Sequence, residues 1–275
     1  MSRITALNIR DYKTSGNKFS MVTAYDYTSA RLAENGNIPV LLVGDSLGMV
    51  VMGYESTIPV TMDDMIRHTQ MVVRGTTTSH VVSDLPFMTY QESPSKALGN
   101  AARLIQEGGA QSIKMEGGEN ISEAISNISR NGIPVMGHLG LTPQYVHALS
   151  GYQLQGKTQK AASKLIDDAI AVEAAGAYAV VLELIPKELS ELITSKLSIP
   201  TIGIGAGPFC DGQVQVFHDI LGLYTDFVPK HTKQYCNLGD IAISALQKYA
   251  EEVSGSIFPS EKNSFSMPQG QLPTP

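Results

Sequence analysis

Residues 40–48 read Val-Leu-Leu-Val-Gly-Asp-Ser-Leu-Gly, and this stretch decides the fold. Four apolar residues in succession are too few for an independent helix, and they predict a strand that is buried on both faces. The run ends abruptly at Gly44, Asp45 and Ser46. A buried strand with an acid at its carboxyl end is the arrangement by which α/β enzymes place side chains in an active site. The fold therefore depends on whether the chain repeats this pattern.

The chain repeats it at intervals along most of its length, because short apolar runs alternate with helical patterns. Eight strands are expected, at residues 21–24, 38–43, 80–86, 112–116, 133–138, 177–183, 200–205 and 226–228. Eight strand–helix units with short connections predict a (β/α)8 TIM barrel, which a short helix over residues 5–13 precedes. A Rossmann-like doubly wound sheet is the alternative fold.

The composition favours one large α/β domain. The chain has 275 residues, of which 43% are apolar and 17% are charged, and 25 are glycine. We place this domain at residues 1–254. Residues 255–275 are rich in Pro, Ser, Gln and Gly and carry too few apolar side chains to bury much surface, so we expect a flexible tail there.

Composition also excludes several classes of function. The net charge of −6 is spread over the chain and forms no basic stripe, so no nucleic-acid partner is expected. No apolar run has the length needed to span a membrane, and the N-terminus lacks the apolar core of a secretion signal. The two cysteines, Cys210 and Cys236, provide no disulfide framework. We therefore expect a cytoplasmic enzyme without a membrane partner.

Charged and polar side chains stand at or just after the carboxyl ends of the predicted strands. They are Asp45, Ser46, Asp84, Lys114, Glu116, His138 and Glu183. Because the carboxyl ends of barrel strands meet at one rim, we expect these side chains to face a common cavity.

Each of these residues, taken alone, also has a structural interpretation. Asp45 could cap a helix, and Asp84 could accept bonds from turn amides. Lys114 could form an ion pair with Glu116, since both lie on one face of a strand. His138 could be a buried histidine of the core. The whole set is much harder to explain by structural roles than any one member.

Several carboxylates at one rim repel each other, and a hard divalent cation relieves that repulsion. Oxygen ligands with no cysteine and at most one histidine favour Mg²⁺ over Zn²⁺. Such an ion leaves positions open for a 2-oxo acid and stabilises an enolate beside its carbonyl. Glu183 follows four apolar residues, where burial raises a carboxyl pKa and suits a general base. Lys114 could hold the substrate carboxylate or the enolate charge.

The glycine-rich segment at residues 203–207 reads Gly-Ile-Gly-Ala-Gly. It lacks both the spacing of a dinucleotide fingerprint and the lysine of a phosphate-binding loop. Tight backbone turns near a ligand explain these glycines better than nucleotide binding does.

Longer segments of the chain resemble the ketopantoate hydroxymethyltransferase family, from about residue 23 to about residue 259. The matching segments are residues 23–27 (TAYDY), 44–49 (GDSLGM), 84–88 (DLPFM), 114–118 (KMEGG), 137–144 (GHLGLTPQ), 173–177 (EAAGA), 203–207 (GIGAG) and 211–213 (DGQ). The resemblance implies a (β/α)8 barrel, assembly as a homodecamer, and small-molecule substrates. It also implies hydroxymethyl transfer from 5,10-methylenetetrahydrofolate to 3-methyl-2-oxobutanoate, which gives 2-dehydropantoate.

The resemblance further implies roles for the residues at the strand ends. Asp45 and Asp84 resemble direct Mg²⁺ ligands, and Glu116 resembles a ligand that acts through water. Ser46 and Lys114 resemble substrate-binding residues, alongside the same two aspartates.

The two remaining residues of the set also match the family. Glu183 resembles its proton acceptor. His138 stands at the position of its active-site histidine, which we group with the substrate-binding residues and whose role is less defined.

Two other functions remain possible from the sequence. A lyase of the phosphoenolpyruvate mutase/isocitrate lyase kind also uses Mg²⁺, acids and an enolate on a barrel, but it depends on a reactive cysteine in a Lys-Cys-Gly type of loop, which this chain lacks. A non-catalytic 2-oxo acid binder or metal sensor would be supported by the loss of one site residue, and all candidates are present.

Overall fold

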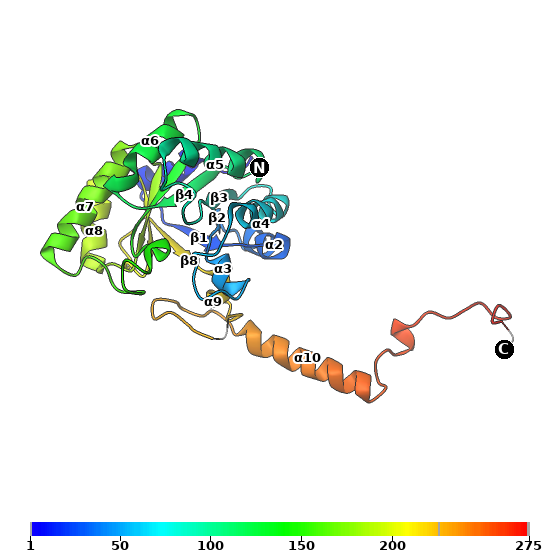
Figure 1. The fold of residues 1–275 in the computed structure, drawn as a ribbon. Coiled ribbons are helices and arrows are strands. Elements are labelled where there is room, and N and C mark those ends of the chain that lie inside the picture. The colour runs from blue at the N-terminus through cyan, green and yellow to red at the C-terminus, as the bar shows by residue number, and fades with distance from the viewer. Residues whose placement is uncertain (1, 225, 274–275) are drawn as a thin grey trace. The chain divides into compact units, whose positions relative to one another are not determined.

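The computed structural model describes residues 2–224 and 226–273, and its centre is a closed barrel of eight parallel strands (Figure 1). The strands are β1 (Phe19–Thr23), β2 (Val40–Val43), β3 (His80–Asp84), β4 (Ser112–Glu116), β5 (Val135–Gly140), β6 (Ala179–Glu183), β7 (Thr201–Ile204) and β8 (Gly212–Gln215). Each strand pairs with the next in sequence, and β8 pairs with β1. The predicted (β/α)8 barrel is confirmed, and the open doubly wound sheet is excluded.

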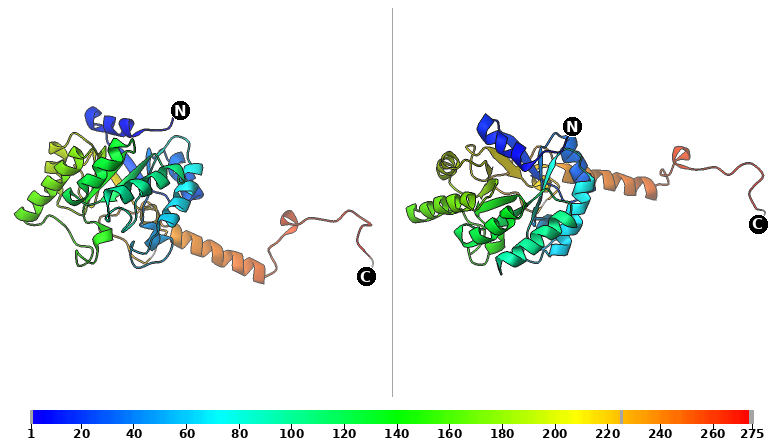
Figure 2. Two further views of the ribbon diagram at one scale, coloured as in Figure 1. Left: turned by 45° about the horizontal axis from the view of Figure 1, so that its top comes forward. Right: turned by 90° about the horizontal axis from the view of Figure 1, so that it is seen from above.

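Helices surround the barrel on its outer side (Figures 1 and 2). They are α2 (Tyr27–Asn35), α4 (Met62–Arg74), α5 (Pro94–Gln106), α6 (Ser122–Arg130), α7 (Gln159–Ala174) and α8 (Lys187–Lys196). Side chains of the expected types cap several of them, such as Thr61 at α4 and Ser93 at α5. Short helical turns in the connections are α3 (Leu47–Val50), η1 (Glu119–Ile121), η2 (Pro143–Tyr145) and α9 (Phe217–Ile220). The sequence pattern did not predict α3, which begins two residues after Asp45.

The N-terminal helix α1 (Ala6–Ser15) closes the amino end of the barrel. Its Ile9 is fully buried and belongs to the same apolar cluster as the inward-facing side chains of the strands. Tyr12 stacks on the ring of Phe19, with 4.7 Å between the ring centroids. The helix expected over residues 5–13 is thus confirmed, and it packs on the interior of the barrel.

A buried polar layer lies just above this helix inside the barrel. His80 Nε2 lies 2.8 Å from Ser112 Oγ, and Ser112 Oγ lies 3.0 Å from the hydroxyl of Tyr178. His80 Nδ1 lies 3.0 Å from the carbonyl oxygen of Ile4, which ties the N-terminal segment to strand β3. Burial lowers the pKa of His80 to about 4, so the ring is neutral at pH 7.

The predicted position of the eighth strand is wrong. Residues 226–228 form no strand, and Phe227 is 66% exposed. The eighth strand is Gly212–Gln215, which precedes the predicted position in the sequence. Its sequence, Gly-Gln-Val-Gln, is not recognisable as a buried strand, because Gln213 is exposed and only Val214 adds an apolar side chain to the interior. A strand with one polar face and a glycine lacks the apolar run that marks the other strands.

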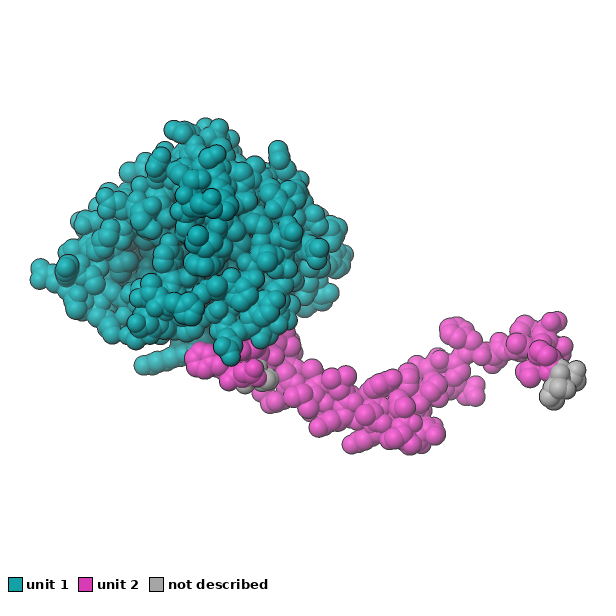
Figure 3. All heavy atoms as spheres, viewed as in Figure 1, with its two compact units in different colours: residues 1–217, 229–232 teal, residues 218–228, 233–275 magenta. Residues whose placement is uncertain are grey.

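The chain divides into two compact units, which Figure 3 colours separately. The first runs to Phe217 and includes Pro229–Thr232, so it holds the whole barrel. The second comprises His218–Val228 and the chain from Lys233 onward, with helix α10 (Leu238–Ser254) and the turn η3 (Glu261–Asn263). Our placement of one domain at residues 1–254 and a flexible tail at 255–275 stays a prediction, and residues 1, 225, 274 and 275 lie outside the described part. No helix among the described residues is long and apolar enough to cross a membrane.

Candidate active site

The carboxyl ends of the strands bring the predicted site residues together inside the barrel. Strand pairing sets Asp84 beside Lys114, and Glu116 beside His138. Since side chains alternate along a strand, Lys114 and Glu116 both point inward. Asp45, Asp84, Lys114, Glu116 and His138 are each at most 4% exposed, and the side chain of Glu183 is 17% exposed. The predicted convergence on one rim is therefore what the structure shows for these six residues.

Ser46 joins this group at the start of α3. Its hydroxyl lies 2.8 Å from the hydroxyl of the buried Tyr25. Ser46 precedes α3, and its side chain forms no capping hydrogen bond there. Gly44 leaves room for the serine, because a Cβ at that position would lie 2.9 Å from Ser46 Oγ. The Ser46 side chain is thus held by Tyr25 and has no structural role in the helix.

Asp84 links two neighbouring strands of the site. Its Oδ1 lies 3.1 Å from Lys114 Nζ, and its Oδ2 accepts a hydrogen bond of 3.1 Å from the backbone N–H of Asp45. The lysine therefore pairs with Asp84, and no ion pair with Glu116 is found among the described residues. The carboxylate of Asp45 accepts a hydrogen bond of 2.8 Å from Gln144 Nε2 and caps no helix.

His138 stands between two carboxylates. Its Nε2 lies 3.1 Å from Glu183 Oε2, and its Nδ1 lies 3.4 Å from Glu116 Oε1 and 3.1 Å from Lys114 Nζ. Nδ1 can donate a proton to Glu116 or accept one from Lys114, but not both at once. Burial and the Lys114 charge oppose protonation, yet the bonds to the two carboxylates raise the pKa of His138 to about 9. The ring therefore connects Glu116 to Glu183.

Negative charge is crowded among the buried acids. Burial raises the pKa of Asp45 well above its usual range, and the charges of Asp84 and Glu116 add to this effect. Burial also raises the pKa of Asp84, although Lys114 counteracts it. Glu116 differs, because its hydrogen bond to His138 lowers its pKa in spite of burial. A site in which neighbouring carboxylates raise each other's pKa is one that a bound cation would stabilise.

The acids fit a Mg²⁺ ion that takes few protein ligands. Asp84 Oδ1 is buried and has no hydrogen-bond partner among the residues that the structure describes, so beyond its 3.1 Å contact with Lys114 it is available as a ligand. Among the described residues, no three His, Cys, Asp or Glu side chains form a ready metal-binding group. Mg²⁺ does not require such a group, since it keeps several waters and binds through one or two carboxylates. Asp45 and Asp84 satisfy that requirement, and Glu116 stands near enough to raise the pKa of Asp45.

Two residues of this site carried no assigned role from the sequence. Gln144 lies in the turn η2 and contacts Asp45 and Glu116, and the hydroxyl of Tyr90 donates a hydrogen bond of 2.8 Å to Gln144 Oε1. Gln144 is the last residue of a segment that resembles the family, which was the one available signal. The contacts of Gln144 and Tyr90 depend on the conformations of loops, which the pattern of apolar residues in strands does not predict.

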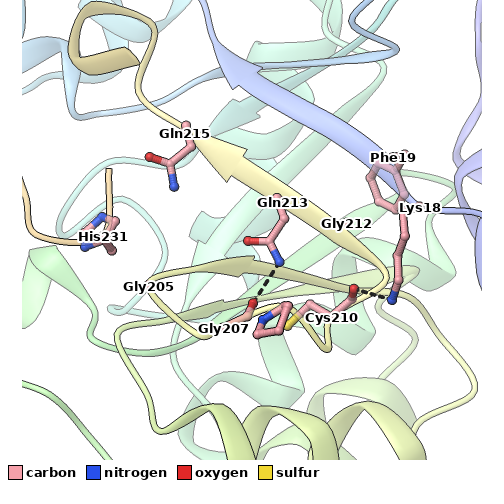
Figure 4. A pocket seen from close by; sticks show the side chains of 10 residues that line it. Lys18, Phe19, Gly205, Gly207, Cys210, Gly212, Gln213, Gln215 and His231 are labelled. Carbon is pink, nitrogen blue, oxygen red and sulfur yellow. Dashed lines mark hydrogen bonds between the residues drawn. The ribbon is translucent and has the colours of Figure 1, made fainter. Parts of the chain in front are cut away.

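A cavity of about 590 Å³ lies away from these acids (Figure 4). It is lined by residues of β8, of the segment between β7 and β8, and of the start of β1, including Gln213, Gln215 and Lys18 just before β1. Gln213 donates a hydrogen bond to the carbonyl oxygen of Gly207, and Lys18 donates one to that of Cys210. Because Val214 faces the interior, the two glutamines flanking it face outward. The cavity contains none of the predicted site residues.

The glycine-rich segment borders this cavity, and its glycines serve packing. Gly205 has a φ of +64°, and a Cβ there would lie 3.2 Å from the ring of His231. Gly207 has a φ of +78°, and a Cβ there would lie 2.5 Å from the Cβ of Lys187. Close backbone turns thus account for both residues.

Comparison with known protein families matches residues 3–261 to the family described as ketopantoate hydroxymethyltransferase. The chain belongs to the ketopantoate hydroxymethyltransferase family. Curated relatives named 3-methyl-2-oxobutanoate hydroxymethyltransferase agree. One from Dehalococcoides mccartyi is 54% identical over 96% of this chain and 95% of its own. Another, from Carboxydothermus hydrogenoformans, is 53% identical over 97% of both chains.

Several solved structures share the fold of this member of the ketopantoate hydroxymethyltransferase family, although their sequence identity to it is low. A putative phosphonomutase from Burkholderia cenocepacia has a TM-score of 0.61 and 15% identity, over 92% of this chain and all of its own. A phosphonopyruvate hydrolase in complex with oxalate and Mg²⁺ has a TM-score of 0.60 and 14% identity, over 94% and 93% of the two chains. A 2,3-dimethylmalate lyase of the PEP mutase/isocitrate lyase superfamily has a TM-score of 0.57 and 16% identity, over 98% and 93%. These three show the barrel fold alone.

Proposed function

We propose that this chain transfers a hydroxymethyl group from 5,10-methylenetetrahydrofolate to 3-methyl-2-oxobutanoate and so forms 2-dehydropantoate. The observation that carries the proposal is the convergence of Asp45, Asp84, Lys114 and Glu183 on one buried rim, in a chain of this family. These groups provide what the reaction needs: a cation site, a fixed positive charge for an oxo acid, and a carboxylate that can accept a proton.

Asp45 and Asp84 would hold a Mg²⁺ ion, with Glu116 in contact through water. The ion would supply positive charge against the negative charge that develops on the substrate oxygens. Lys114, fully buried and held by Asp84, binds the carboxylate of the oxo acid. Ser46 donates a hydrogen bond to the same substrate, and its bond to Tyr25 fixes its position.

Glu183 accepts the proton from C3 of 3-methyl-2-oxobutanoate. His138 holds Glu183 Oε2 at 3.1 Å and borders the substrate site. The resulting enolate carbon attacks the methylene carbon of the folate, so that a carbon–carbon bond forms and the first of the two carbon–nitrogen bonds of that methylene breaks. Water then forms the carbon–oxygen bond of the product hydroxyl as the second carbon–nitrogen bond breaks. Both nitrogens end protonated, and the folate leaves as tetrahydrofolate.

Proton exchange without folate tests the first step separately. In heavy water, Mg²⁺ and the protein should cause the NMR signal of the C3 proton of 3-methyl-2-oxobutanoate to disappear. Adding 5,10-methylenetetrahydrofolate should then give 2-dehydropantoate. A lyase would instead cleave a bond of its substrate, and a non-catalytic binder would leave the C3 signal unchanged; either result would overturn the proposal.

Assembly and location belong to the same proposal. We propose a homodecamer in the cytoplasm, with small molecules as the ligands, on the basis of the family resemblance. Light scattering on the purified full chain should give a mass near ten times 29.5 kDa, and a monomer or dimer would contradict the assembly.

A further inference from the structure

Gln144 contacts two of the three acids that we assign to the cation site. Its side-chain Nε2 donates hydrogen bonds of 2.8 Å to Asp45 Oδ2 and 2.9 Å to the carbonyl oxygen of Leu85. Its backbone N–H donates a hydrogen bond of 3.0 Å to Glu116 Oε2. The residue is 2% exposed, so these bonds form away from bulk water, where a lost partner is costly.

The neighbours of Gln144 allow a single orientation of its amide. Asp45 Oδ2 and the carbonyl of Leu85 can only accept, so the NH2 group must face them. On the other side, the hydroxyl of Tyr90 and the amide of Gln91 donate to Oε1, at 2.8 Å and 3.2 Å. In a flipped amide, the oxygen would face Asp45 and the Leu85 carbonyl, which are acceptors. The NH2 group would face the two groups that now donate to Oε1.

Tyr90 extends the same network to the backbone of Glu116. Its hydroxyl oxygen accepts a hydrogen bond of 3.1 Å from the N–H of Glu116 and lies 3.0 Å from the carbonyl oxygen of that residue. Gln144 and Tyr90 come from the loops after β5 and β3, whereas Asp45 and Glu116 come from the ends of β2 and β4. The network therefore fixes two acids from separate strands relative to each other.

We propose that Gln144 is a positioning residue, which holds one oxygen of Asp45 and one of Glu116 so that the carboxylates keep the orientation the cation requires. The inference rests on the proposed function, because it assumes that these acids bind a divalent ion. Among the described residues, the Gln144 amide provides the one hydrogen bond to the Asp45 carboxylate. Without it, the carboxylate could turn toward Lys114. Outer contacts of this kind affect metal affinity by about 10- to 100-fold.

Binding of Mn²⁺, a paramagnetic substitute for Mg²⁺, tests the inference without using activity. The free ion is counted by electron paramagnetic resonance while the full chain is titrated. Gln144→Met keeps the volume of the side chain and the backbone N–H that bonds Glu116, but removes the side-chain NH2 that bonds Asp45 and Leu85. Its Kd for Mn²⁺ should therefore rise about 10- to 100-fold. Gln213→Met is the matched control, because Gln213 lies on the outer face of β8, where its side chain donates a hydrogen bond to the carbonyl oxygen of Gly207 and contacts none of the acids. Its Kd should equal that of the wild type.

Tyr90→Phe provides a second, milder variant in case Gln144→Met does not fold. It removes the hydrogen bond to the Gln144 amide and the one that the hydroxyl accepts from the N–H of Glu116, and it should raise the Kd by about 2- to 10-fold. Circular dichroism at the temperature of the titration shows whether each variant is folded. A folded variant with a raised Kd supports the positioning role, whereas a Kd that rises only in proportion to an unfolded fraction would contradict it.

The outcomes separate this inference from the proposed function. A wild-type chain that bound no Mn²⁺ would overturn the cation site and this inference with it. A wild-type chain that binds Mn²⁺ and a folded Gln144→Met or Tyr90→Phe variant that binds it equally well would overturn the role of Gln144 alone.

Discussion

Lys114 is the residue on which the charge balance of the site depends. It is buried between Asp84 and His138, at 3.1 Å from an atom of each. Burial disfavours its charge, but the surrounding acids outweigh that effect and raise its pKa above the usual range. The surrounding acids therefore favour the charged ammonium, which is already in place for an anionic substrate.

Replacing Glu183 with glutamine should remove the base and leave the rest of the site intact. Glu183→Gln keeps the size of the side chain and a contact with His138. We expect it to bind Mg²⁺ and 3-methyl-2-oxobutanoate while the exchange of the C3 proton slows by about 10²- to 10⁴-fold. NMR in heavy water measures this rate. Glu188→Gln, on the exposed part of α8, is the control. Exchange at the wild-type rate in Glu183→Gln would assign the base to another residue.

Replacing Asp84 with asparagine should weaken cation binding. Asp84→Asn keeps an oxygen for the N–H of Asp45 and removes one negative charge. Because affinity for hard cations follows the number of charged ligands, we expect Mg²⁺ binding to fall on the order of 10-fold or more. Isothermal titration measures it, with Asp63→Asn on the surface of α4 as the control. Titration curves that coincide with those of the wild type would remove Asp84 from the ligands.

At the scale of elements, strand β8 begins at a glycine that its packing requires. A Cβ at Gly212 would lie 2.7 to 2.9 Å from three atoms of the Phe19 ring. That ring cannot easily move, since Tyr12 stacks on it. The contact between β1, β8 and α1 therefore requires a residue without a side chain at position 212.

Gly212→Ala should destabilise the barrel by about 1 to 3 kcal/mol through overpacking. Urea unfolding of the full chain measures this change. Gln213→Ala, on the outward side of the same strand, should change stability by less than about 0.5 kcal/mol. A second change, Phe19→Leu, should restore part of the loss in Gly212→Ala by making space. Equal stability of the two single variants would contradict this account of β8.

The elements also show how far the sequence determines fold and site. Strand β2 could be predicted because all four of its residues are buried, so its apolar run is unbroken. Strand β8 could not, because its pattern contains one interior apolar side chain, Val214. The acids at strand ends could be predicted to meet because parallel strands of a barrel point one way. Gln144 could not, because its position follows from two loops folding against each other.

At the scale of the whole molecule, stability should depend on pH through His80. Burial lowers its pKa from 6.5 to about 4 in the folded state. Between these values the unfolded chain binds a proton that the folded chain does not, so folding is favoured at higher pH. The contribution of neutral His80 to the free energy of unfolding is fully present above pH 6.5 and is lost as the pH falls toward 4. The loss amounts to about 3 kcal/mol.

Urea unfolding at pH 7 and at pH 4.5 tests this prediction. The wild type should lose more stability between the two than His80→Asn, which cannot titrate in that range. Its amide keeps a donor for the carbonyl oxygen of Ile4. An equal loss in the two proteins would place the pH dependence elsewhere.

The helix α1, which fills the amino end of the barrel, also determines where small molecules can enter and leave. With Ile9 and the stacked Tyr12 and Phe19 filling that end, substrate, product and the deuterons of heavy water must all pass through the opposite mouth. A molecule bound in that mouth would block substrate entry, product release and deuteron exchange together. A competitive blocker of the mouth should therefore suppress exchange and turnover in equal proportion.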